Sequence, residues 1–231
     1  MVAKTLSRLE DKETGFRWYY VEGSPPSEWY VSVTTVLKLI VDRRLKSYFI
    51  RTGEAEQKQR REQTSESGTQ LHDLIEQSLM SGSYVVPPHF EKAMSKWSEI
   101  CNEHRISASQ TEFTVYSDKY GYAGTADIIG YYGGVPAVMD VKTGWYDIKT
   151  GWQLAAYKQA YEEIYGGSLG MVGFKISRDG YEAKTFPYST EGMRGCLLSF
   201  LAALQTWKGV YFNALKRNDW RWLHVDSVQP A

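Results

Sequence analysis

The chain has 231 residues, of which 42% are hydrophobic and 23% are charged, and its formal net charge at pH 7 is zero. This composition is typical of a globular domain and excludes disordered, collagen-like and coiled-coil proteins. A neutral chain cannot hold a nucleic acid by its overall field, so such a partner needs a local basic surface. The apolar stretches are shorter than the roughly 20 residues of a membrane helix, and residues 1–15 lack an apolar signal segment. We therefore expect a cytoplasmic protein without a membrane partner.

One stretch, residues 42–61, concentrates positive charge. Either contact with phosphates or an ordinary solvated helix face explains this run, and charge patterning alone does not choose between the two. Its cations are Arg43, Arg44, Lys46, Arg51, Lys58, Arg60 and Arg61.

The N-terminal part of the chain predicts two strands and a helix. Residues 18–21 and 29–33 are rich in aromatic and β-branched side chains, and they flank the turn-forming Gly and Pro residues of 23–26. Thr34 or Thr35 can cap a helix that extends to about residue 50.

Two further helices follow a polar segment, residues 52–67, for which we expect no regular structure. The first covers residues 67–80, carries apolar side chains at helical spacing, and ends near Gly82. The second covers residues 89–104 and begins after two prolines.

The second half of the chain predicts most of the strands. The dipeptide Gly133-Gly134 supplies the positive φ angles of a tight hairpin between strands 124–132 and 135–143. The other predicted elements are a strand at 110–116, a helix at 152–165, strands at 171–177 and 181–187 joined by Arg178-Asp179-Gly180, and a helix at 190–216.

Together these elements predict an α/β fold, with a central mixed sheet flanked by helices. We expect one domain with three parts. They are N-terminal strands with a helical elaboration (1–107), an α/β core (108–216) and a C-terminal tail (217–231).

The predicted hairpin brings two acidic residues together. If Tyr132 pairs with Val135, Asp127 lies directly opposite Asp140, and cross-strand Cβ atoms are about 4.5–5.5 Å apart. Because side chains alternate along a strand, Lys142 shares a face with Asp140. Two like charges so placed destabilise a hairpin unless a cation cancels them, although a surface ion pair beside an exposed aspartate is a simpler alternative.

Two carboxylates and a lysine suit the hydrolysis of a phosphodiester. Carboxylate oxygens are preferred ligands of Mg²⁺ or Mn²⁺, and one or two such ions would stabilise the transition state and acidify a bound water. The lysine would orient or deprotonate that water, or neutralise developing charge, and the sequence does not choose among these roles.

Five short motifs follow one another between residues 32 and 157. They are Ser32-Val33-Thr34, Gly68-Thr69-Gln70-Leu71-His72, Gly124-Thr125-Ala126-Asp127, Asp140-Val141-Lys142-Thr143-Gly144 and Gln153-Leu154-Ala155-Ala156-Tyr157. In this order they resemble the PD-(D/E)XK nuclease superfamily, in its RecB-like, phage-type exonuclease branch. The resemblance implies a restriction-endonuclease-like core.

The resemblance also implies a role for each motif residue. Asp127, Asp140, His72 and the Val141 carbonyl would ligate the metal, and Lys142 would be catalytic. Taken alone, His72 is more simply a satisfied core histidine.

Further residues would support the site or contact DNA, and Glu112 would be an additional acid. Gln153 and Tyr157, at i and i+4 of one helix, would lie beside the site, although a half-buried polar seam explains them equally well. Trp145 could stack on an unpaired base. The residues expected to contact DNA or to support the site are Ser32, Thr34, Arg43, Arg44, Trp145, Gln153 and Tyr157.

The cysteines favour no metal cluster. Cys101 and Cys196 are far apart and lack a C-x-x-C partner, so we interpret them as buried free thiols. The four cysteines that hold an iron-sulfur cluster in some members of the branch are missing, so the resemblance implies none here.

The function implied is a Mg²⁺-dependent exonuclease that acts on single-stranded DNA or DNA ends in phage-type recombination, repair or processing. Its partners would be DNA and a recombination or replication protein, and a phage-encoded protein would work in the host cytoplasm. The alternatives are a flap or junction endonuclease on the same core and a catalytically silent DNA-binding protein. Retention of both carboxylates and the lysine favours an active enzyme.

Overall fold

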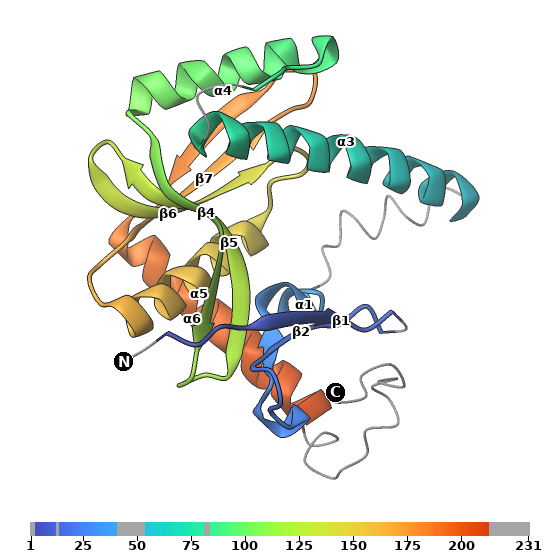
Figure 1. The fold of residues 1–231 in the computed structure, drawn as a ribbon, viewed down its shortest axis with the longest axis vertical. Helices are drawn as coiled ribbons and strands as arrows, with labels where there is room; N and C mark the ends of the chain where they lie inside the picture. The colour runs from blue at the N-terminus through green and yellow to red at the C-terminus, as the bar shows by residue number, and fades with distance from the viewer. Residues whose placement is uncertain (1–2, 13, 41–53, 81–83, 213–231) are drawn as a thin grey trace.

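An eight-stranded mixed β-sheet forms the centre of the molecule, and helices cover both of its faces (Figure 1). The structure is a computed structural model, and the predicted α/β class is confirmed. The described part of the chain excludes residues 1–2, 13, 41–53, 81–83 and 213–231, as well as the side chains of 54–66 and 212. None of the helices in the described part is both long enough and apolar enough to cross a membrane.

The elements have the following bounds. In chain order they are β1 (Ser7–Glu10), β2 (Arg17–Tyr20), β3 (Tyr30–Ser32), α1 (Val33–Leu37), α3 (Glu54–Met80), α4 (Glu91–His104), β4 (Ser107–Ser117), β5 (Tyr122–Tyr132), β6 (Val135–Lys142), α5 (Ile148–Tyr165), β7 (Gly170–Ile176), β8 (Ala183–Pro187) and α6 (Thr190–Trp207).

The strand order is β1-β2-β3-β5-β6-β7-β8, with β4 paired to the other edge of β5. The β3–β5 and β6–β7 pairs are parallel, and the other pairs are antiparallel. β5 pairs with β6 only from Ile128 to Tyr132, and with β3 at Tyr122 and Ala123. Residues 124–126 of β5 pair in the described ladders with β4 alone, and Asp127 has no ladder pair, so the sheet opens there. We call this opening the β5 fork.

The β5–β6 hairpin has the predicted turn and register. Gly133 and Gly134 have φ angles of +60° and +84°, values that favour glycine. Tyr132 pairs with Val135, as the two-residue turn requires. The register prediction is therefore confirmed up to the β5 fork.

Two predictions for the N-terminal half are wrong. Residues 54–67, for which no regular structure was expected, belong to α3. Their Glu, Gln, Lys and Arg side chains favour a helix without forming an apolar stripe, which is why periodicity missed them. The strand β1 was also missed, because Ser7–Glu10 is short and poor in β-branched residues.

Other helix ends differ from the predictions in smaller ways. α1 ends at Leu37, and the remainder of the helix predicted up to residue 50 lies mostly outside the described residues. α5 begins at Ile148, four residues before the predicted start. α6 passes at Lys208 into a π-helical turn, and residues 213–216 of the predicted last helix are not described.

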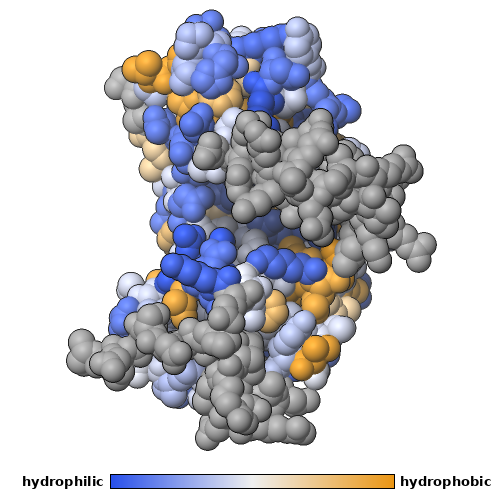
Figure 2. Space-filling model, turned by 90° about the vertical axis from the view of Figure 1, so that its right-hand side faces the viewer, coloured by the Kyte–Doolittle hydropathy of each residue, from blue (hydrophilic) through white to orange (hydrophobic). Residues whose placement is uncertain are grey.

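Two apolar cores hold the helices on the sheet. On one face α1, α5 and α6 pack on the sheet through side chains such as Leu154, Phe200 and Trp207. On the other face α3 and α4 pack on the sheet through side chains such as Leu71 and Trp97. On the side shown in Figure 2, hydrophilic surface predominates among the coloured residues, and apolar groups form separate patches.

Successive side chains of β6 point to opposite faces of the sheet and so into the two cores. Ala137, Met139 and Val141 pack toward α3 and α4, whereas Val138 packs toward α5 and α6. The pleat therefore directs the even-numbered Asp140 and Lys142 toward the side of α1 and α5.

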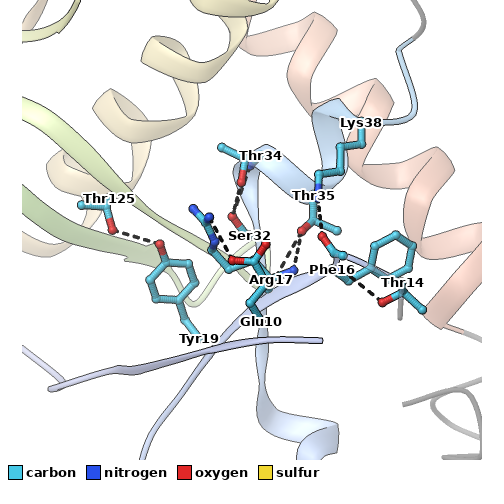
Figure 3. A network of polar contacts seen from close by, with 11 residues as sticks. Glu10, Thr14, Phe16, Arg17, Tyr19, Ser32, Thr34, Thr35, Lys38 and Thr125 are labelled. Carbon is cyan, nitrogen blue, oxygen red and sulfur yellow. Dashed lines mark hydrogen bonds and ion pairs between the residues drawn. The ribbon is translucent and has the colours of Figure 1, made fainter. Parts of the chain in front are cut away.

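The N-terminal strands are tied to the rest of the sheet next to the β5 fork (Figure 3). The Tyr19 hydroxyl from β2 and the Thr125 hydroxyl from β5 lie 2.9 Å apart and share a hydrogen bond. The Arg17 amide donates to the Thr35 hydroxyl at 2.8 Å, which connects β2 to α1. These bonds fix α1 beside the fork.

A close approach of β4 to β5 generates a stability prediction. A Cβ atom at Gly130 would lie 2.0 Å from the carbonyl oxygen of Ser107, where β4 is irregular, and a backbone atom cannot easily move away. We expect Gly130→Ala to lower the free energy of unfolding by about 2 kcal/mol or more, measured by urea denaturation. The control is Gly170→Ala in β7, whose Cβ would lie 3.6 Å from its nearest neighbour. Equal stabilities of the two variants would contradict the prediction.

Candidate metal centre

The carboxylate of Asp127 lies inside the β5 fork. One step beyond the last ladder pair, Ile128 with Met139, the same register places Asp127 opposite Asp140. The Val141 amide donates to Asp127 Oδ2 at 3.2 Å. A side-chain oxygen thus takes the place of a strand carbonyl, which satisfies the β6 amide and keeps the strands apart.

Side-chain alternation along β5 is interrupted at the same residue. Ala126 and Ile129 belong to the core under α5 and α6, whereas Ile128 belongs to the core under α3 and α4. In a regular strand Ala126 and Ile128 would share a face. The regular alternation predicted for this strand therefore does not continue through Asp127, whose carboxylate instead reaches the β6 backbone.

Helix α3 brings a histidine to the fork. His72 Nε2 lies 2.6 Å from the Val141 carbonyl oxygen and 3.4 Å from Asp127 Oδ2. A Cβ atom at Gly68, one turn earlier, would lie 3.1 Å from Thr143 Oγ1, so the glycine allows α3 to approach the end of β6. One imidazole nitrogen, one carboxylate and one backbone carbonyl thus converge from three elements.

The second carboxylate is buried beside this group. Asp140 is 0% exposed, and Lys142 Nζ donates to its Oδ1 at 2.8 Å. Asp140 Oδ2 is also buried, and no group in the described part of the chain donates to it. Such an oxygen is costly to leave unpartnered, and it is the kind of ligand that Mg²⁺ prefers. The donor set therefore fits a hard divalent cation.

The candidate metal ligands are engaged in hydrogen bonds and an ion pair with neighbouring groups of the site. Within the described residues, no three His, Cys, Asp or Glu side chains are grouped as a metal site would require. One donor of the set is the backbone carbonyl of Val141, and the carboxylate of Asp140 is paired with Lys142. Entry of an ion would therefore exchange these contacts for ligand bonds.

Charge is strongly coupled within the site. Burial and the charge of Asp140 raise the pKa of Asp127 to about 7, against the opposing effects of Lys142 and His72. Burial alone would lower the pKa of His72, but Glu76, Asp127 and the Val141 carbonyl raise it to about 9. Burial likewise opposes protonation of Lys142, but Asp140 and Asp127 outweigh it, so its pKa is raised.

The predicted additional acid, Glu112, lies close to a glutamate that the sequence analysis missed. Glu112 has a φ angle of +46°, rare for a residue with a side chain, and interrupts β4 opposite Asp127. Burial, then the charge of Glu76 and a hydrogen bond with it, raise the pKa of Glu112. Glu76 Oε1 lies 3.6 Å from His72 Nδ1. Its i+4 spacing from His72 on α3 is a signal that could have identified it.

Two cavities meet at the end of β6. The larger, of about 600 Å³, lies under α3 and includes His72, Glu112 and Arg178 in its wall. The smaller, of about 250 Å³, lies beside α1 and α5. Lys142 and Trp145 line both cavities. The Trp145 side chain is 61% exposed, so its ring is accessible for stacking.

The other predicted DNA contacts differ in accessibility. Thr34 and Gln153 line the smaller cavity. Tyr157 is buried at 2% exposure, packs against Gly124 and accepts a hydrogen bond from Gln153 at 3.0 Å. Ser32 is 1% exposed and caps α1 by accepting from the Thr34 amide. Its hydroxyl also lies 2.8 Å from the Thr34 hydroxyl (Figure 3). Ser32 is therefore placed to support α1 as its N-cap.

Two predicted contacts cannot be placed. Arg43 and Arg44 lie outside the described residues. Their assignment to DNA binding stays a prediction.

Comparisons with known proteins identify no family for the chain. No protein-family model matches it, and no curated protein matches it. A crystal structure from Eubacterium rectale, named "Putative exonuclease", is similar at 15% sequence identity with a TM-score of 0.33. The match covers 47% of this chain and 50% of that one, so it spans about half of each protein. A likeness at this level supports no argument about function.

Neutralising one carboxylate tests the charge balance of the site. Asn at position 127 keeps an oxygen for the Val141 amide but removes the charge. Because the pKa of Asp127 is raised from 3.8 to about 7, the folded protein holds a proton that the unfolded chain releases. Wild-type stability in EDTA should therefore fall as the pH rises through this window.

We expect the stability of Asp127→Asn in EDTA to rise relative to the wild type by about 3 kcal/mol between pH 5 and pH 8, because the wild type loses stability over the about two pH units up to the raised pKa of Asp127, and one pKa unit equals about 1.4 kcal/mol. The measurement is thermal unfolding at both pH values. Asp73→Asn, an exposed position next to His72, is the matched control and should change little. A stability of Asp127→Asn that does not rise relative to the wild type between these pH values would show that the two carboxylates do not repel.

Proposed function

We propose that the protein is a Mg²⁺- or Mn²⁺-dependent nuclease of the PD-(D/E)XK superfamily, in the RecB-like branch. The observation that supports this most is the convergence of His72, Asp127 and the Val141 carbonyl beside the unpartnered buried oxygen of Asp140. These residues belong to motifs that lie far apart in the sequence and follow one another in the order of the family. A structural ion pair would not explain a second buried carboxylate placed next to the first.

The chain's own groups would divide the work. Asp127, Asp140, His72 and the Val141 carbonyl would hold one ion, and a second ion, if bound, would lie toward Glu76 and Glu112 in the wall of the larger cavity. A bound divalent ion supplies positive charge to the phosphate and acidifies water. Lys142, at the mouth shared by both cavities, would release Asp140 and donate to a phosphate oxygen or to the attacking water.

The proposed substrate is DNA, as single strands or as duplex ends, and exonuclease activity is the first candidate. The smaller cavity supports a strand-binding role, because Lys38 and Lys149 line it together with Thr34 and Gln153. Trp145 offers an exposed ring to an unstacked base at the junction of the cavities. Phage-type recombination or DNA processing, with a recombination or replication protein as partner, is the context that the resemblance suggests.

Removal of the lysine or of the metal tests the mechanism. We expect Lys142→Ala to reduce cleavage of an end-labelled oligonucleotide by at least about a hundredfold, while binding to DNA persists, because one charged donor is lost from the site. Wild-type cleavage should stop in EDTA and return with Mg²⁺ or Mn²⁺.

Lys184→Ala is the matched control, because it removes an exposed lysine of β8 that is paired with Glu182, and this variant should cleave normally. Cleavage that survives either Lys142→Ala or EDTA would reject the proposed chemistry. Binding to DNA without cleavage in any divalent metal would instead favour a silent DNA-binding protein.

The form of the substrate separates exonuclease from endonuclease. An exonuclease needs a free end, so we expect a linear single-stranded DNA to be degraded and its covalently closed circle to remain intact. The products are compared on a denaturing gel at equal enzyme concentration. Linearisation of the circle, or selective cutting at a flap or junction, would assign the endonuclease alternative.

A further inference from the structure

The turn between β7 and β8 presents an arginine to the larger cavity. Arg178 lies in the cavity wall together with His72, Lys142 and Trp145. In the parallel register Lys142 pairs with Lys175, so Trp145 and Arg178, each three positions after this pair, follow the ends of the two strands at the same edge of the sheet. Ligands of open α/β sheets commonly bind at the carboxyl ends of parallel strands.

Hydrogen bonds within the turn hold its backbone in one shape. The Ser177 amide donates to the Glu182 carbonyl, and the Gly180 amide donates to the Ser177 carbonyl, at 2.8 and 2.9 Å. The Ser177 hydroxyl accepts from the Glu182 amide at 2.8 Å. A Cβ atom at Gly180 would lie 2.6 Å from the backbone of Lys92, so the turn also sits directly against α4. The base of the Arg178 side chain is therefore fixed.

Arg178 lacks a carboxylate partner in the part of the chain that the structure describes. Its Nε is buried and has no hydrogen-bond partner. The adjacent carboxylate, Asp179, instead accepts from the Ser177 hydroxyl at 2.6 Å and from the Tyr181 amide at 3.0 Å. Other acids of the same cavity wall, Glu76 and Glu112, are engaged with each other. A buried donor without a partner needs an explanation, and an external acceptor that binds the guanidinium would supply one.

The chemistry of that acceptor follows from the cavity. A guanidinium presents parallel N–H groups that match a phosphate, and charge-assisted bonds of this kind are about twice as strong as neutral ones. Trp145, 61% exposed on the neighbouring strand end, offers a stacking face in the same cavity. An aromatic ring beside an unpaired guanidinium is suited to a nucleotide unit, which combines a base with a phosphate.

We propose that Arg178 binds a phosphate of the substrate strand at some distance from the phosphodiester that is cleaved, and that Trp145 stacks on an adjacent base. This inference rests on the proposed nuclease function and adds a subsite to it. Arg178 would hold the strand at a defined distance from Lys142, and so determine which phosphodiester reaches the metal centre. It is a positioning residue, because it lies outside the group of donors around Asp127 and Asp140.

The test is a scan of single neutral phosphates in a single-stranded oligonucleotide. Each oligonucleotide carries one methylphosphonate, and affinity is measured by fluorescence anisotropy in EDTA, where cleavage does not occur. For the wild-type protein we expect one position to weaken binding by about tenfold. Arg178→Ala should bind the unmodified strand about tenfold more weakly and show no further loss at that position, whereas other positions keep their effects.

Two further variants make the result specific. Arg178→Lys keeps the charge without the fork and should lie between the wild type and Arg178→Ala. Arg194→Ala removes an exposed arginine on α6 that lines a different cavity, and it should bind as the wild type does. The urea midpoint of Arg178→Ala should equal that of the wild type, because no hydrogen bond to the described residues is lost.

Wild-type affinity of Arg178→Ala, or an unchanged position-specific loss in that variant, would overturn the inference. The cleavage assay with Mg²⁺ separates this failure from that of the proposed function. A wild-type protein that binds and cleaves DNA while Arg178→Ala behaves identically removes only the subsite. A wild-type protein that neither binds nor cleaves removes both.

Discussion

A carboxylate hydrogen-bonded to a strand amide organises this protein. Where β5 and β6 would otherwise continue their ladder, Asp127 accepts from the Val141 amide, and the strands separate. The separation leaves β5 free to pair with β3 further along, so the N-terminal strands join the same sheet. The same bond directs the Val141 carbonyl toward His72. The opening of the sheet and the grouping of oxygen and nitrogen donors thus have one cause.

The β5 fork places two carboxylates, those of Asp127 and Asp140, in the interior of the protein. Burial and the charge of Asp140 raise the pKa of Asp127, and the cations Lys142 and His72 offset only part of that rise. The backbone of Glu112 adopts an unfavourable φ angle on the neighbouring strand, so strain and charge gather at one level of the sheet. Strained backbone and unbalanced buried charge are characteristic of sites whose stabilising partner is a ligand.

The two sides of the fork differ in charge. On the α3 side the cavity is lined by acids close to His72, and Arg178 is placed at the ends of β6 and β7. On the α1 and α5 side the smaller cavity carries lysines and hydroxyl groups. Trp145 stands between the two. A polyanionic strand that follows the lysines would reach the donors around Asp127 from the basic side, and Arg178 would limit how far it extends.

The sequence by itself determined the α/β class, the β5–β6 hairpin and the neighbourhood of Asp127 and Asp140, because a Gly-Gly turn and the two-residue period of a strand are local properties. The reach of His72 to the same point was expected only through the motif resemblance. Tertiary structure alone decided the β5 fork, the positive φ of Glu112, the burial of Ser32 and the exposure of Arg178 to the cavity. These features depend on which segments, distant in the sequence, pack against one another, and no local pattern encodes that packing.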